Sequence, residues 1–274
     1  MIEYDLINKG PIMRAHLVQL DIQWESPQAN FDRVRSLVDA AQVNAGDLIA
    51  LPELFDNGFT LNTRESCDTD GKTLAFLAQL AQDTGCIVHG SRAIMLPESD
   101  RALNCATVMA PESAAPICEY HKIHPFSIGK ELEAYQGGTE LFQYTLGTNE
   151  SMIRVCPAVC YDLRFPELFR KGALDGAEMF VLGANWPVAR QHHWRALLIA
   201  RAIENQVFVL GINRCGDDPN LHYGGGTIAV GPKGEILGEL DDTQSVLSVD
   251  IDPSQVHQWR ERFQVFNDIK IRSF

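Results

Sequence analysis

Short runs of apolar residues alternate with amphipathic stretches along most of the chain. Four runs in the first half have the length and apolar character of buried strands: 14–20, 47–52, 86–91 and 103–110. Between the first two, apolar residues at helical spacing follow Ser26-Pro27, which is a typical helix start. A second amphipathic helix is expected from about Lys72 to a stop at Gly85. The first half is therefore predicted to follow the order β-α-β-α-β-β.

The second half repeats this rhythm. Its apolar runs, which are expected to be strands, cover residues 152–160, 178–183 and 207–213. Helices are expected near Pro166 and over residues 189–205, and a hairpin is expected around residues 232–234. Alternating β and α units imply sheets covered by helices, so the sequence predicts an α/β protein. The two similar halves predict two sheets packed face to face as pseudo-two-fold halves, with helices outside both.

No linker or change of composition separates the two halves, so one domain is expected over residues 13–252. Residues 1–12 are expected to be an N-terminal extension, either a loose segment or the product of an upstream start, because Met13 directly precedes the first strand. Residues 253–274 are expected to form a C-terminal arm. The arm carries aromatic side chains that either pack within the chain or dock on another subunit, namely Trp259, Phe263, Phe266 and Phe274.

Charge and cysteine content narrow the function classes. The 274 residues include 23 Lys and Arg against 36 Asp and Glu, a net charge of −13, so nucleic acid and anionic membranes should be repelled and a small-molecule substrate is expected. No apolar stretch approaches the roughly 18 residues that span a bilayer, and the N-terminus resembles no secretory signal. Seven irregularly spaced cysteines are expected to be reduced thiols in the cytoplasm. Because C-x-x-C, H-E-x-x-H and phosphate-loop motifs are absent, neither a metal nor a cofactor is expected.

Three reactive side chains each follow a predicted strand. Glu53 is hemmed in by apolar residues, which should raise the pKa of its carboxyl and make it a general base. Lys122 lies in the segment YHKIHPF, where a partly buried lysine must be paired or give up its proton. Cys160 ends a strand just before the helix near Pro166, and helix N-termini favour thiolates. Taken singly, each has an ordinary explanation: a surface glutamate, a solvated lysine and a buried structural cysteine.

Taken together, the three side chains suit acyl transfer from a C–N bond. Glu53 would take the thiol proton while Cys160 attacks a carbonyl carbon. Lys122, with a backbone N–H near Tyr161, would hold the oxyanion. These residue types in one site therefore indicate a cysteine-dependent hydrolase that works through a thioester.

The segments around these residues resemble motifs of the carbon–nitrogen hydrolase (nitrilase) superfamily, which uses a Glu-Lys-Cys triad. The matching segments are LPELF at Glu53, HKIHPF at Lys122, CYDLRFPELFR at Cys160, GANWP at 183–187 and ARAIEN at 200–205. The resemblance runs from about Met13 to about Asp252. It implies a four-layer α-β-β-α sandwich that assembles into homodimers or larger homo-oligomers.

Within the superfamily the chain is most similar to the omega-amidase branch, through Asn57-Gly58-Phe59 and through NWP followed by His193-Trp194. Members of that branch hydrolyse side-chain amides of 2-oxo acids, such as 2-oxoglutaramate and 2-oxosuccinamate, and release ammonia. Another reaction of the superfamily (nitrile, N-carbamoyl or other amide hydrolysis) is the nearest alternative. A non-catalytic binding protein, and a redox sensor that pairs Cys160 with Cys156, are the alternatives from other classes.

The resemblance also implies further site residues. The family often has a second glutamate in the loop after the lysine, which is expected to join the catalytic residues. Glu131 fits an ungapped count from Lys122 better than Glu133 does. The residues expected to bind substrate are Tyr161, Asn185 and Trp186.

Charged residues near these segments have expected roles as well. Asp162, Arg164 and Glu167 are expected to form an ion pair behind the cysteine. Because the whole chain is acidic, a substrate carboxylate would need a local cation other than the triad lysine. Arg190 and Arg214 are the candidates, although each has the alternative of being a solvated surface arginine.

Overall fold

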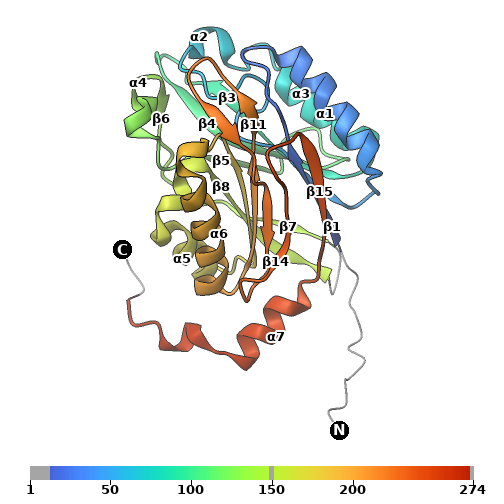
Figure 1. Cartoon of the computed structure of the whole chain (residues 1–274), viewed down its shortest axis with the longest axis vertical. Helices are drawn as coiled ribbons and strands as arrows, with labels where there is room; N and C mark the ends of the chain where they lie inside the picture. The colour runs from blue at the N-terminus through green and yellow to red at the C-terminus, as the bar shows by residue number, and fades with distance from the viewer. Residues whose placement is uncertain (1–12, 148–150, 272–274) are drawn as a thin grey trace.

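Two β-sheets lie face to face in the computed structural model, which describes residues 13–147 and 151–271. Figure 1 shows helices on the outer side of both sheets. The helices outside the first sheet are α1 (Pro27–Ala41) and α3 (Lys72–Thr84), and those outside the second are α5 (Pro166–Leu174) and α6 (Gln191–Asn205). The predicted four-layer α-β-β-α sandwich is therefore confirmed.

The first sheet has the strand order β15-β1-β2-β3-β4-β5, with β6 paired to β4. Strands β1, β2 and β3 run parallel, and β15, β4 and β5 extend the sheet in antiparallel fashion. The bounds are β1 (Met13–Gln19), β2 (Leu48–Ala50), β3 (Ile87–Met95), β4 (Ala102–Met109), β5 (Cys118–His121), β6 (Tyr135–Gln136) and β15 (Ser245–Ile251).

The second sheet has the order β14-β13-β10-β9-β8-β7. Its parallel strands β8, β9 and β10 are joined through α5 and α6, just as β1, β2 and β3 are joined through α1 and α3. The bounds are β7 (Tyr144–Leu146), β8 (Ile153–Val159), β9 (Met179–Ala184), β10 (Phe208–Asn213), β13 (Ile228–Val230) and β14 (Ile236–Glu239). The two halves of the chain therefore share one β-α-β-α-β-β order, as their similar patterns predicted.

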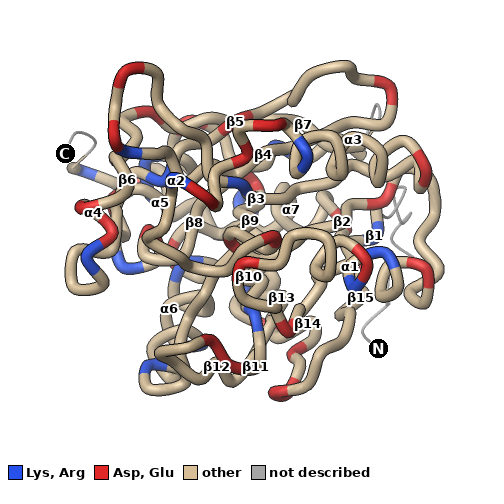
Figure 2. The backbone as a smooth tube through the Cα atoms, turned by 90° about the horizontal axis from the view of Figure 1, so that it is seen from above, with Lys and Arg blue, Asp and Glu red and all other residues tan. Residues whose placement is uncertain are grey.

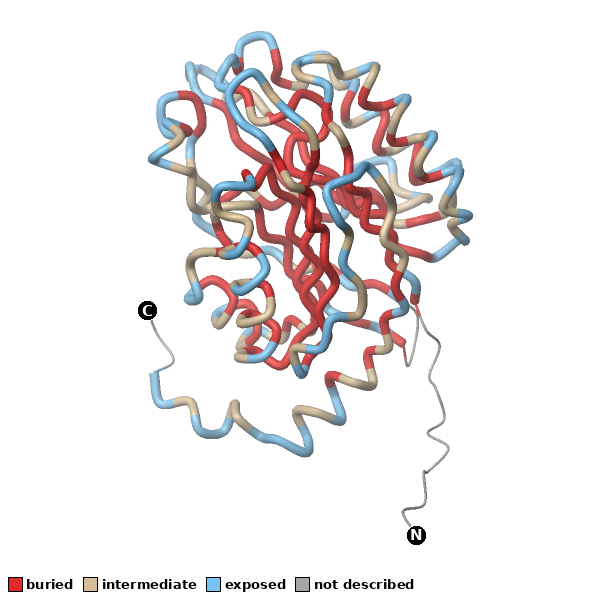
Figure 3. Tube along the Cα trace, in the orientation of Figure 1, coloured by how far each residue is buried: buried red, intermediate tan, exposed pale blue. Residues whose placement is uncertain are grey.

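Apolar side chains from both sheets fill the space between them. Leu17 and Ala50 of the first sheet meet Val155, Val181 and Leu210 of the second, and all five are fully buried. Figure 3 shows this as a buried centre of strands, whereas the outer helices are buried along one face only. Strands that are covered on both faces have almost continuous apolar sequences, which is why the sequence pattern identified them.

The main element that the pattern missed is β15. It pairs antiparallel with β1 over seven residues, from Met13 opposite Ile251 to Gln19 opposite Ser245. Most of its side chains are only half-buried, so it lacks the continuous apolar signature of the central strands. Its partner also lies more than two hundred residues earlier in the chain, and local patterning carries no information about such a pairing.

Smaller elements and the C-terminal segment complete the chain. The small elements are α2 (Thr63–Ser66), α4 (Glu131–Ala134), the pair β11 (Cys215–Asp217) and β12 (His222–Gly224), and the 3-10 helices η1 (Ser127–Gly129), η3 (Cys160–Arg164) and η4 (Val188–Arg190). Helix α7 (Ser254–Arg262) and η5 (Val265–Asp268) run below the two sheets in Figure 1.

The C-terminal segment contacts the body of its own chain. Arg260 donates hydrogen bonds to the carbonyl oxygens of Ala177 and Gln206, and Phe266 packs against the core under α5 and α6.

The predicted extension 1–12 and the aromatic Phe274 lie outside the described residues. The domain boundaries 13–252 and 253–274 stay predictions. Over the described part of the chain, no helix has the length and apolarity that crossing a membrane requires.

Candidate active site

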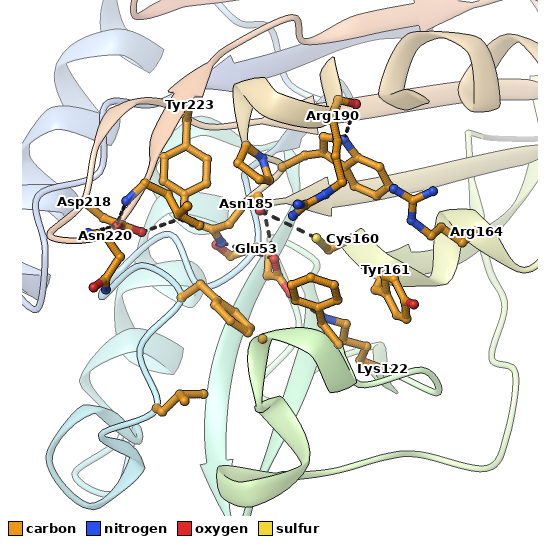
Figure 4. Close-up of a pocket in the computed structure, with 17 residues that line it drawn as sticks. Glu53, Lys122, Cys160, Tyr161, Arg164, Asn185, Arg190, Asp218, Asn220 and Tyr223 are labelled. Atoms are coloured by element: carbon orange, nitrogen blue, oxygen red, sulfur yellow. Dashed lines mark hydrogen bonds and ion pairs between the residues drawn. The ribbon is translucent and has the colours of Figure 1, made fainter. Parts of the chain in front are cut away.

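The ends of several strands bring the predicted reactive residues to one place. Glu53, Cys160 and Asn185 follow the parallel strands β2, β8 and β9, and Lys122 follows β5. The carboxyl ends of parallel strands are the usual position of sites in α/β proteins. The Nζ atom of Lys122 donates to Oε1 of Glu53 over 2.9 Å, and both side chains are almost completely buried. Figure 4 shows Glu53, Lys122 and Cys160 around one pocket.

Cys160 occupies a turn that sets it apart from the strand before it. Its φ of +45° lies in the left-handed region, which non-glycine residues rarely adopt. It opens η3, a five-residue 3-10 helix that the sequence did not predict, and α5 then begins at Pro166 as expected. The first N–H groups of a helix have no partner within that helix. The N–H of Tyr161, the residue after Cys160, is one of these first N–H groups of η3.

The second glutamate that the structure brings to the site is Glu131. Both of its carboxylate oxygens accept from Nζ of Lys122, at 3.1 and 2.9 Å, and its side chain is fully buried. Glu133 is instead exposed, with its nearest cation Lys130 at 3.9 Å. Lys122 therefore lies between two carboxylates, one from the loop after β2 and one from α4.

Asn104 is a site residue that sequence reasoning missed. Its Nδ2 donates to Oε1 of Glu53 at 2.8 Å and to Oε1 of Glu131 at 3.1 Å, so it ties the two carboxylates together. It lies in the middle of β4, and a single amide within an apolar strand gave no sequence signal for this role.

The charge state of this cluster follows from its contacts. Burial by itself would raise the pKa of Glu53, but the attraction of Lys122 and hydrogen bonds from Lys122, Asn104 and Asn185 outweigh it, so the pKa lies below its ordinary value. Burial would lower the pKa of Lys122, but the carboxylates of Glu131 and Glu53 raise it well above the ordinary value. The expectation of a raised glutamate pKa is therefore corrected: Glu53 is ionised because a cation is buried with it.

The pKa of the Cys160 thiol shifts in the opposite direction to the one expected from its place near a helix start. Burial and the negative charge of Glu53 raise the pKa of Cys160 well above its ordinary value, and Lys122 offsets this only in part. The predicted stabilisation of a thiolate at a helix start is thus outweighed. The site at rest contains a neutral thiol, an ionised carboxylate and an ammonium group.

Asn185 positions Glu53 through its backbone and its side chain. Its backbone N–H donates to Oε2 of Glu53 at 2.9 Å, and its Nδ2 donates to the Glu53 carbonyl oxygen at 2.7 Å. Its own carbonyl oxygen lies 3.9 Å from Sγ of Cys160 and accepts from the thiol. Asn185 therefore links the carboxylate to the cysteine turn.

Asp162 holds the cysteine turn from behind. It is fully buried and accepts from the hydroxyl of Tyr120 at 2.7 Å, from Nδ1 of His124 at 2.8 Å, and from the N–H of Val159 at 3.0 Å. The expected ion pair behind the cysteine is therefore wrong: Asp162 is occupied by these donors. Arg164 instead lies over the ring of Trp186 at 4.9 Å, and Glu167 is exposed.

A pocket of about 290 Å³ opens in front of these residues. Sites for small molecules usually measure roughly 300–1,000 Å³, so this one fits a small substrate. Glu53, Lys122, Cys160 and the three expected substrate-binding residues Tyr161, Asn185 and Trp186 all line it, whereas Glu131 lies behind Lys122. Further lining residues, which sequence reasoning had not placed in the pocket, are Phe59, Phe126, Arg164, Asp218 and Tyr223.

The two arginines proposed from the sequence are separated by the structure. Arg190 lines the pocket. Arg214 is fully buried, and its Nη2 donates to the carbonyl oxygens of Ile22 and Asp217. Arg214 is therefore excluded as a cation for the substrate. Over residues 13–147 and 151–271, no three His, Cys, Asp or Glu side chains are grouped in a way that could hold a metal ion.

Comparisons with known proteins match nearly the whole chain. A family model described as carbon–nitrogen hydrolase matches residues 14–261. Omega-amidase YafV of Yersinia enterocolitica is 34% identical over 258 residues, which cover 93% of this chain and 96% of the relative. The 2-oxoglutaramate amidase of Bacillus subtilis is 33% identical over 257 residues, which cover 92% and 96%. The solved structure of XC1258 from Xanthomonas campestris, a CN-hydrolase superfamily protein with an arsenic adduct in its active site, matches with a TM-score of 0.87 at 31% identity, covering 97% of this chain and 100% of that one.

Proposed function

The chain belongs to the carbon–nitrogen hydrolase family and is an amide C–N hydrolase, and from that premise we propose that it uses Cys160 to hydrolyse the side-chain amide of a small 2-oxo acid. The observation that carries the proposal is the charge arrangement of the pocket. An ionised carboxylate, a charged lysine and a neutral thiol share one buried cluster. Such a set can move a proton and stabilise an anion without help from water.

In the first step Sγ of Cys160 attacks the amide carbon, and Glu53 accepts the thiol proton. A base is required because the resting cysteine is a thiol. The carbonyl oxygen becomes an oxyanion, which accepts from Lys122 and from the N–H of Tyr161. Lys122 has three N–H donors, which at rest face Oε1 of Glu53 and both oxygens of Glu131, so the oxyanion takes over one of these contacts when it forms.

In the second step the tetrahedral intermediate collapses. Glu53 returns the proton to the leaving nitrogen, the C–N bond breaks, and ammonia departs while the acyl group stays on Cys160 as a thioester. Glu53, ionised again, then removes a proton from a water molecule that attacks the thioester. The carboxylic acid leaves and the thiol regains its proton, so the net reaction consumes one amide and one water.

Glu131 and Asn104 support this cycle without touching the reacting atoms. Glu131 keeps Lys122 charged throughout, because its carboxylate stays beside the ammonium group when Glu53 becomes protonated. Asn104 holds Glu53 and Glu131 in a fixed relation. Both are therefore proposed as positioning residues.

Two observations support a 2-oxo acid amide as the substrate. Relatives that match more than nine-tenths of the chain are named omega-amidase and 2-oxoglutaramate amidase. The pocket is also small, and its walls combine aromatic rings with arginine side chains. Such walls suit a short, partly apolar molecule that carries an anionic group.

An ammonia-release assay on the purified chain tests the proposal. The substrates are 2-oxoglutaramate, 2-oxosuccinamate, simple nitriles and N-carbamoyl amino acids. We expect the two 2-oxo amides to give the highest kcat/KM. Faster turnover of a nitrile or an N-carbamoyl amino acid would contradict the proposed substrate while leaving the cysteine mechanism in place.

A further inference from the structure

Two arginine side chains at the pocket have no carboxylate partner within 4.0 Å among the described residues. The guanidinium group of Arg190 lies over the ring of Phe126, 5.3 Å from its centroid, and that of Arg164 lies over Trp186 at 4.9 Å. Both are half-buried and both line the pocket. In Figure 4, Arg190 and Lys122 lie on opposite sides of Cys160.

The two pocket arginines belong to a chain with a net charge of −13. Figure 2 shows acidic residues in loops around the molecule, and a number of surface cations have a carboxylate partner. Arg195, on the exposed face of α6, has such a partner in Glu239 at 3.0 Å. The two pocket arginines instead face aromatic rings, which leave guanidinium donors available to a ligand.

The one other carboxylate in the pocket wall, Asp218, is already occupied. Its Oδ1 accepts from the N–H groups of Asn220 and Leu221 at 2.7 Å, and its Oδ2 accepts from the hydroxyl of Tyr223 at 2.6 Å. Lys122, for its part, is paired with Glu53 in the pocket wall and with Glu131 behind it. The cations of the pocket wall that have no carboxylate partner within 4.0 Å among the described residues are therefore the two arginines.

Arg190 is the better placed of the two for direct contact. Its backbone is fixed, because its carbonyl oxygen accepts from Nε1 of Trp186 at 2.8 Å and its N–H donates to the Pro187 carbonyl oxygen. Its guanidinium has no hydrogen-bond partner of its own within the described chain, whereas Arg164 shares a hydrogen bond with Nδ1 of His193 at 3.2 Å. The planar guanidinium fork matches the two oxygens of a carboxylate.

Resting on the proposed function, we propose that Arg190 is the specificity-determining residue that binds the substrate carboxylate distant from the scissile amide, with Arg164 adding to the positive potential. The substrate class is then a short amide that carries a carboxylate at its far end. The aromatic rings hold the connecting carbons, Lys122 and the Tyr161 N–H hold the amide oxygen, and Arg190 fixes the length between the two ends.

The test compares a charged amide with an uncharged amide of equal chain length. The substrates are 2-oxoglutaramate and pentanamide, and the variants are Arg190→Gln and Arg190→Lys. We expect Arg190→Gln to raise KM for 2-oxoglutaramate about 10- to 100-fold, as the loss of a charge-assisted hydrogen bond should, and to leave kcat/KM for pentanamide within about two-fold. Arg190→Lys should recover part of the lost affinity for 2-oxoglutaramate, because lysine keeps the positive charge but lacks the planar guanidinium group. Arg195→Gln is the matched control and should change neither substrate.

A binding measurement separates this inference from the proposed reaction. The dissociation constant of 2-oxoglutarate, the acid that the hydrolysis would form, is measured by calorimetry and needs no turnover. An increase of about 10-fold or more in Arg190→Gln supports the inference even if no amide is hydrolysed, an outcome that would overturn the proposed function alone. An unchanged dissociation constant, or equal losses for charged and uncharged amides, would overturn the role of Arg190.

Discussion

At the scale of single residues, the central feature is a lysine enclosed by two carboxylates. Breaking a buried ion pair leaves an uncompensated charge, so each member depends on the others. The arrangement keeps Lys122 charged and Glu53 ionised in a place where burial would favour neutral forms of both. Cys160 can then remain a thiol until substrate arrives, because the base that removes its proton is permanently available.

The dependence of these residues on one another leads to a prediction about paired substitutions. We expect Glu53→Gln and Lys122→Ala each to lower kcat on the order of 10³-fold or more, because the proton acceptor or the oxyanion donor is lost. The double variant should be little worse than either single one, since the residues act as a unit. Steady-state rates with 2-oxoglutaramate check this, and losses that multiply would indicate two independent functions.

Sequence reasoning selected side chains that the structure brings together, but it misjudged their electrostatics. Glu53, Lys122, Cys160 and Glu131 were reachable because each lies in a recognisable segment that follows an apolar strand or the triad lysine. Asn104 could not be identified from the sequence, because its role depends on two carboxylates from other parts of the chain. The pKa directions of Glu53 and Cys160 were wrong for the same reason: they are set by which charges are buried together.

At the scale of elements, the ends of strands decide where chemistry can occur. The loop after β2 carries Glu53, η3 after β8 carries Cys160, and the turn after β9 carries Asn185. The central strands and covering helices were predictable from apolar runs and helical stripes. The edge strand β15 and the helix η3 were not, because one depends on a distant partner and the other on a strained local turn.

The loop after β2 also carries a second buried carboxyl, Asp56, whose titration should be measurable. Burial raises its pKa from 3.8 to about 6, although Thr73 donates to its Oδ2 at 2.7 Å. Because the folded pKa exceeds the unfolded one, its contribution to stability is fully present below about pH 4 and is lost as the pH rises through about 6. The difference between about 6 and 3.8 corresponds to roughly 3 kcal/mol.

We therefore expect Asp56→Asn to gain stability relative to the native chain as the pH rises from 4 to 7, by up to about 3 kcal/mol. Urea denaturation at several pH values measures this difference. The exposed aspartate Asp175, replaced by Asn, is the control and should give a curve parallel to that of the native chain. A constant difference between Asp56→Asn and the native chain across this range would contradict a raised pKa in the folded state.

At the scale of the whole molecule, stability rests on the contact between the two sheets. His89 of β3 and Tyr144 of β7 form a polar contact across this interface, with Nδ1 of the histidine 2.9 Å from the hydroxyl oxygen. The surrounding layer is apolar, so a charge on His89 would be poorly solvated.

The predicted homo-oligomer and the predicted cytoplasmic location stay predictions at this scale.

Acid should weaken the sandwich through His89. Burial lowers its pKa from 6.5 to about 3, so its contribution to stability is present above about pH 6.5 and is lost as the pH falls towards 3. We expect the native chain to lose up to about 1.4 kcal/mol more than His89→Gln for each pH unit below 6.5. Denaturation at pH 7.5, 6 and 5 tests this, and parallel curves for the two proteins would rule it out.

The measurement that tests the central claim most directly is the activity of Cys160→Ala beside that of Cys156→Ala. Cys156 is fully buried on the strand that leads to Cys160, so it is a matched control for the loss of a thiol. With 2-oxoglutaramate as substrate, Cys160→Ala should show no measurable ammonia release while its circular dichroism and Tm stay close to native. Cys156→Ala should keep substantial activity. If Cys160→Ala retained more than a few per cent of the native rate, the cysteine mechanism proposed for this enzyme would be wrong.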